Sequence, residues 1–106
     1  MMKQANLTKK QREDVLSTWK KLTAYLDENK FQTVEEAVEH LPDGYVFEEF
    51  IPHSDPKVYP AVVVTKLPWQ FMLSFNPFAG YVTNHTEVSY FNMKTKEWEE
   101  SFFNGY

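Results

Sequence analysis

Cysteine is absent from this chain of 106 residues, which excludes disulfide bonds, thiolate chemistry and cysteine-based zinc sites. Only three glycines and six prolines occur, so the composition is not that of a disordered chain. No apolar run is long enough to span a bilayer, and the opening residues MMKQANLTKKQRED lack the apolar core of a signal peptide. These absences predict a single domain over residues 1–106 that resides in the cytoplasm and does not bind membranes.

Basic residues are missing from residues 31–55, and this is the sharpest feature of the charge distribution. Seven Lys/Arg face four Asp/Glu in residues 1–30, but four lysines face eleven acids in residues 31–106, which gives a net charge of −4. The acids of the cation-free segment are Glu35, Glu36, Glu39, Asp43, Glu48, Glu49 and Asp55. Such a surface repels nucleic acid and attracts a basic partner, although a solvated acidic face without a partner has the same composition.

A helical pattern runs from Thr8 to about Asn29. Thr8 is a suitable N-cap, and charged residues cover the polar face. The apolar face consists of Val15, Trp19, Leu22 and Leu26, with Leu16 beside them. We expect this helix to pack across a sheet.

A second, shorter helix is predicted to begin at Thr33, because Thr33 and Glu36 have the spacing of a capping box. Glu35 and Glu36 in its first turn also interact favourably with the helix dipole. Its apolar face consists of Val34, Ala37, Val38 and Leu41. The run Pro42, Asp43, Gly44 ends the helix.

After Gly44 the apolar residues follow strand-like patterns separated by short turns. The predicted strands are Tyr45–Ile51, Val58–Lys66, Trp69–Phe75, Thr86–Asn92 and a short fifth strand that follows Met93–Trp98 and ends near Phe103. Successive strands with short connections favour an antiparallel sheet. The sequence therefore predicts an α+β fold, with two N-terminal helices packed on one face of a four- to five-stranded, mainly antiparallel sheet.

Residues that carry chemistry occur in no recognisable catalytic pattern. The histidines His40, His53 and His85 form no HExxH or HxH pair, and Ser54 and Asp55 directly after His53 do not make a triad by themselves. No P-loop, GxGxxG or GxSxG motif is present. The glutamates of the second helix are more typical of a solvated face than of a glycosidase pair. We therefore predict a binding protein that is not an enzyme and uses no cofactor or metal.

Direct nucleic-acid binding is also disfavoured. The basic residues Lys9, Lys10, Arg12, Lys20 and Lys21 are interleaved with acids on the first helix, which is typical of the polar side of an amphipathic helix. Aromatic residues of the later strands have the ability to stack on bases, but the sheet region has few cations to hold phosphates.

Three segments in order resemble the staphylococcal uracil-DNA glycosylase inhibitor family, a group of small proteins associated with mobile elements. They are TVEEAVEHLPDGYV (Thr33–Val46), SDPKVYPAVVV (Ser54–Val64) and Asn84–His85 before a strand rich in Tyr and Phe. The resemblance implies two N-terminal helices followed by an antiparallel sheet. It also implies a DNA mimic that binds uracil-DNA glycosylase one to one as a monomer and so inhibits DNA repair.

In that family, acidic and hydroxyl groups take the place of DNA phosphates, and a hydrophobic pocket captures the apolar side chain that the enzyme inserts into DNA. The implied partner-binding residues here are Glu28, Gln32, Thr33, Val34, Glu35, Glu36, Asp55 and His85. The implied pocket, between the second helix and the sheet, has as candidate linings Val38, Leu41, Val62, Val64, Phe71, Leu73 and Val88, each of which is equally a candidate core residue.

Gln32 departs from the family pattern, because a glutamate is expected at this position. One phosphate substitute is therefore neutral, and Glu28, Glu35 or Glu36 is expected to supply the charge. Other functions remain open from the residues alone: inhibition of another nucleic-acid-binding protein, as in anti-restriction or anti-CRISPR proteins, a small ligand-binding module or enzyme, or single-strand binding on the sheet.

Overall fold

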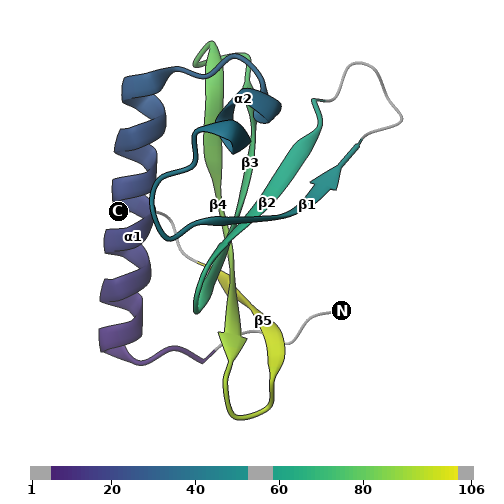
Figure 1. The fold of residues 1–106 in the computed structure, drawn as a ribbon. Coiled ribbons are helices and arrows are strands. Elements are labelled where there is room, and N and C mark those ends of the chain that lie inside the picture. The colour runs from purple at the N-terminus through teal and green to yellow at the C-terminus, as the bar shows by residue number, and fades with distance from the viewer. Residues whose placement is uncertain (1–5, 53–58, 103–106) are drawn as a thin grey trace.

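Five antiparallel strands form a sheet in which each strand pairs with its neighbours in sequence (Figure 1). The computed structural model describes residues 6–52 and 59–102. Two helices, α1 (Lys9–Asn29) and α2 (Val34–Glu39), precede the strands. The strands are β1 (Val46–Ile51), β2 (Ala61–Lys66), β3 (Trp69–Asn76), β4 (Tyr81–Asn92) and β5 (Glu97–Phe102). The predicted α+β class and antiparallel sheet are confirmed.

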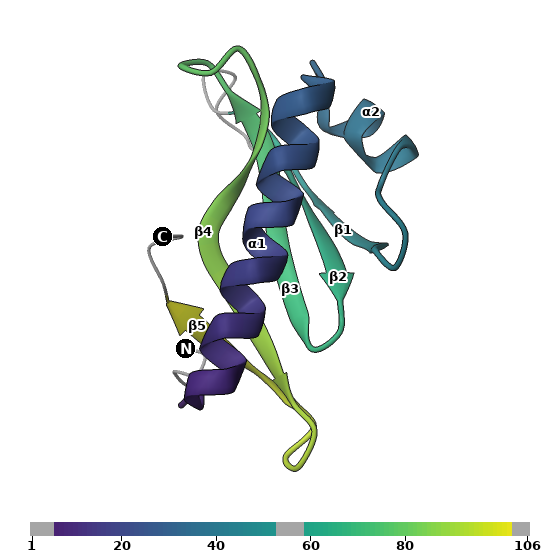
Figure 2. The same cartoon turned by 90° about the vertical axis from the view of Figure 1, so that its left-hand side faces the viewer.

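Helix α1 lies across the sheet and buries the predicted apolar stripe against it (Figure 2). Val15, Leu22 and Leu26 are buried. A capping box closes the first turn, in which Gln11 N donates to Thr8 Oγ1 at 3.1 Å and Thr8 N donates to Gln11 Oε1 at 2.8 Å. No helix in the described part of the chain is long and apolar enough to cross a membrane.

Helix α2 has only six residues and depends on the sheet for its stability. Thr33 is the N-cap as predicted, because Glu36 N donates to Thr33 Oγ1 at 3.1 Å. Only this half of the predicted capping box is formed, since the Glu36 side chain does not accept from Thr33 N. Val34 and Ala37 are buried together with Phe31 in the core that α1 also covers. Both helices therefore pack on the same face of the sheet.

The core lies between these helices and the middle strands. Val62 pairs with Leu73, and Val64 pairs with Phe71. All four side chains are at most 1% exposed. The burial of each such side chain contributes about 1.5–3 kcal/mol to folding, so this layer of β2 and β3 is the main support of the fold.

The predicted start of the fourth strand at Thr86 is wrong, because β4 begins at Tyr81. Residues 81–84 already pair with β3. The register then shifts, and the polar residues 85–87 interrupt the alternating pattern on which the prediction relied. His85 therefore lies inside a strand and not in a loop before one.

The other strand boundaries differ from the predicted ones by small shifts. β1 begins at Val46 and not at Tyr45, and β3 extends to Asn76. The predicted first residue of the second strand, Val58, lies outside the described residues, and β2 begins at Ala61. Pro60 lacks a backbone N–H for the ladder, which is consistent with this later start.

Strand β1 is an edge strand that contains a bulge. Phe47 pairs with Val64 and Phe50 pairs with Val62, so both phenylalanines lie on the helix face although they are three residues apart. They are 43% and 45% exposed. The two glutamates between them, 48 and 49, are exposed. The bulge thus gives β1 two exposed aromatic rings on one face.

Candidate partner-binding site

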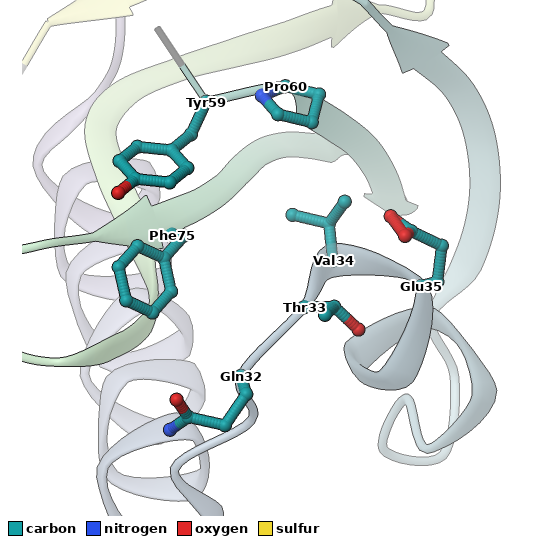
Figure 3. Close-up of a pocket in the computed structure, with 7 residues that line it drawn as sticks. All are labelled: Gln32, Thr33, Val34, Glu35, Tyr59, Pro60 and Phe75. Carbon is teal, nitrogen blue, oxygen red and sulfur yellow. The ribbon is translucent and has the colours of Figure 1, made fainter. Parts of the chain in front are cut away.

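A groove of about 370 Å³ opens where the α1–α2 connection meets the start of β2 and the end of β3 (Figure 3). Val34 lies at its centre and is only 3% exposed. The rings of Tyr59 and Phe75 lie side by side on one wall, with centroids 4.8 Å apart. The lining residues are Gln32, Thr33, Val34, Glu35, Tyr59, Pro60 and Phe75.

The Gln32 side chain is held in one orientation at the edge of this groove. Its Nε2 donates to Gly80 O at 2.9 Å and to Lys30 O at 3.2 Å. Val82 N donates to Phe31 O at 2.8 Å, which fixes the adjoining backbone to β4. Oε1 of Gln32 accepts no hydrogen bond from the described residues and lies toward Phe75 in Figure 3. The amide therefore presents an oriented acceptor.

One acidic residue of α2 lies at the end of the groove opposite Gln32. Glu35 lines it, and its carboxylate lies away from Gln32 (Figure 3). Glu36 and Glu39 are exposed on the same helix. Thr33 Oγ1 is used as the helix cap, but its hydroxyl hydrogen remains available as a donor. Four predicted partner-binding residues, 32–35, are thus brought together around one groove.

The remaining predicted partner-binding residues are not brought to this groove. Glu28 is exposed near the end of α1, and Asp55 lies outside the described residues. Glu36 donates its backbone N–H to the Thr33 cap of α2 but does not line the groove. His85 lies on β4 and does not line the groove either.

The His85 side chain lies on the sheet face away from the helices. Its Nε2 is 2.6 Å from Oγ of Ser74, and Ser74 alternates with the core residue Leu73 on β3. The indole of Trp19 donates to His85 O at 2.8 Å from the helix side. Burial lowers the pKa of His85 below its ordinary value of 6.5, and the charge of Glu87 partly opposes this shift.

The residues suggested as pocket linings are mostly core residues. Val62, Val64, Phe71, Leu73 and Val88 are all at most 3% exposed. Val38 and Leu41 are partly buried against them. None of these seven residues lines the groove, because they belong to the core that the helices cover or pack against it.

Three groove residues were not identified from the sequence: Tyr59, Pro60 and Phe75. The pair Tyr59–Pro60 belongs to the second segment of the family resemblance, so a signal for it was present. Phe75 gave no such signal, because an aromatic residue at the end of a predicted strand is equally typical of a core.

Within residues 6–52 and 59–102, no three His, Asp or Glu side chains lie close enough together to hold a metal ion. The closest approach to a catalytic pair in this part of the chain is Ser74 with His85, and no carboxylate is hydrogen-bonded to that histidine. The groove instead combines apolar walls with hydrogen-bond acceptors, which suits recognition of another protein.

Comparison of the chain with known protein families, curated proteins and solved structures finds no match.

Proposed function

We propose that this protein inhibits uracil-DNA glycosylase as a DNA mimic and is not itself an enzyme. The observation that carries the proposal is the groove at the start of α2. There, in the segment that resembles the inhibitor family, apolar walls lie between the acceptor oxygens of Gln32 and Glu35, and none of the described lining residues is a cation. A mimic of DNA needs both acceptors for the enzyme's phosphate-binding donors and a place for its apolar side chain.

Each part of the groove has a role in this proposal. Glu35, Glu36 and Glu39 accept charge-assisted hydrogen bonds from groups that otherwise hold phosphates. The apolar side chain that the enzyme inserts into DNA enters over Val34, between Pro60 and the Tyr59–Phe75 wall. Burial of a leucine-sized side chain there contributes about 1.5–3 kcal/mol. We place this association in the cytoplasm, between one inhibitor and one enzyme.

The test is a titration of the protein into a uracil-excision assay with purified glycosylase. We expect stoichiometric loss of excision, and we expect no binding of the protein to single-stranded DNA in a gel shift. Full activity at micromolar excess of the protein would rule out the proposal.

Inhibition of another basic-cleft protein is the second candidate. It is favoured by Glu48 and Glu49, two exposed acids that lie on β1 and not on α2. A pull-down from bacterial lysate, with the captured proteins identified by mass, separates the two functions. Recovery of a different nucleic-acid-binding protein without glycosylase supports the second one.

A further inference from the structure

Gln32 stands where the resemblance predicts an acid, and its surroundings are built for an amide. The two backbone carbonyls of Lys30 and Gly80 both lie within hydrogen-bonding distance of Nε2, at 3.2 and 2.9 Å. A carbonyl oxygen only accepts hydrogen bonds, and the amide of Gln32 supplies a donor to both. A glutamate would place a carboxylate oxygen against two carbonyl oxygens. This geometry therefore disfavours the acid.

The same two hydrogen bonds fix the free end of the amide. Since Nε2 is held by the α1–α2 connection on one side and by the β3–β4 turn on the other, Oε1 is directed to the groove edge (Figure 3). An acceptor that is already oriented loses little conformational freedom on binding. An amide oxygen also carries no net charge, so its desolvation without a cation costs less than that of a carboxylate.

We propose that Gln32 is a specificity-determining residue that presents Oε1 to a neutral N–H or O–H donor of the partner. This inference rests on the proposed function, and it names the chemistry of one contact. Cationic groups of the cleft are met by the glutamates of α2, whereas the donor opposite Gln32 is uncharged and lies beside the apolar side chain in the groove. Simple charge counting predicts that an added acid at position 32 improves binding by a DNA mimic. We expect the acid to weaken binding.

The test measures the dissociation constant for purified uracil-DNA glycosylase at low and high salt, together with the melting temperature of each free variant. Gln32→Glu adds a charge and removes both hydrogen bonds. Gln32→Met keeps the size of the side chain but has no amide. Ala79→Glu is the matched control, because it adds one acid at an exposed position beside Gly80 without replacing the amide.

We expect both Gln32 variants to bind about tenfold more weakly at either salt concentration, as the loss of one oriented hydrogen bond to the partner implies. Ala79→Glu is expected to bind like the wild type. Tighter binding by Gln32→Glu, with a steeper salt dependence, overturns the inference because it identifies a cation opposite Gln32. Unchanged binding by Gln32→Met also overturns it, since the amide then has a structural role only. If the wild type itself does not bind glycosylase, the proposed function fails together with the inference. If the wild type binds but the Gln32 variants give either of the contrary results above, only the inference about Gln32 fails.

Discussion

Asn84 is a buried polar side chain that joins β4 to α1, and it is 8% exposed. Thr23 Oγ1 donates to Asn84 Oδ1 at 3.1 Å, and Asn84 Nδ2 donates to Trp19 O at 3.4 Å. The sequence does not reveal this role, because an asparagine beside a histidine is typical of a turn. Its place in a strand is explained by the helix groups that satisfy its amide.

Replacement of Asn84 by alanine should therefore lower the free energy of unfolding by about 1–3 kcal/mol, because the hydrogen bonds of its buried amide to Thr23 and to Trp19 O are both lost. The Thr23 hydroxyl keeps Trp19 O as an acceptor at 2.9 Å. Urea denaturation measures the change. Thr23→Ala and the double variant complete a cycle, and we expect the double variant to be less destabilised than the sum of the two single ones. Strictly additive changes in the free energy of unfolding would show that Asn84 and Thr23 do not interact.

His85 should make the stability of the protein depend on pH. Burial lowers its pKa in the folded state below the ordinary value of 6.5, so the unfolded chain binds a proton more readily. The contribution of His85 to the free energy of unfolding is therefore fully present above pH 6.5. It is lost as the pH falls from there toward the lower pKa of the folded state. We expect His85→Gln to remove part of the decline in urea midpoint between pH 7.5 and pH 5.5. An identical decline in wild type and variant would assign it to other groups.

At the scale of elements, the bounds of α1 and the start of α2 were predicted well because their signals are local. The end of α2 was placed too late, because the helix ends at Glu39 and Leu41 lies beyond it. Thr8 and Thr33 each accept the hydrogen bond that defines a cap, and the apolar stripe of α1 has one period throughout. The start of β4 was missed because the register shift on that strand depends on its neighbour β3. The groove was missed for a related reason: uncovered space depends on where α2 meets the sheet.

The cap of α2 offers a test of how the groove is held. Thr33→Ala should destabilise the protein by about 0.5–2 kcal/mol, since a six-residue helix loses the side chain that closes its first turn. Glycosylase inhibition should weaken in parallel, because Val34 and Glu35 lie in that turn. Thr33→Ser keeps the hydroxyl and should restore both. Thermal unfolding and the excision assay are the two measurements, and normal inhibition by a destabilised Thr33→Ala would separate the cap from the groove.

At the scale of the molecule, the acids without nearby cations are concentrated on one part of the chain. Helix α1 is nearly balanced, with five basic residues against four acids, whereas α2 and β1 carry exposed acids and no Lys or Arg. The net charge of −4 therefore understates how acidic the α2 and β1 segments are. A basic cleft is attracted to the α2 side, and this attraction is screened by salt.

Charge reversal on that side should weaken inhibition. We expect Glu35→Lys with Glu36→Lys to raise the inhibitor concentration for half-maximal effect at least tenfold, with the larger loss at low salt where the repulsion between like charges is least screened. Glu97→Lys with Glu100→Lys, both exposed on β5, changes the net charge equally and should have little effect. Equal losses from the two pairs would refute an oriented acidic face.

The bulge in β1 has a consequence for how the molecule behaves at high concentration. An open sheet edge is a template on which a second chain readily adds a strand. If the β1 strands of two copies paired at this edge, Glu48 and Glu49 of one copy would lie against the same two acids of the other. The bulge also interrupts the regular row of N–H and C=O groups on β1. Pairing of two copies through β1 is thus disfavoured although this strand exposes two aromatic rings, and the surface beside the groove stays free for a partner.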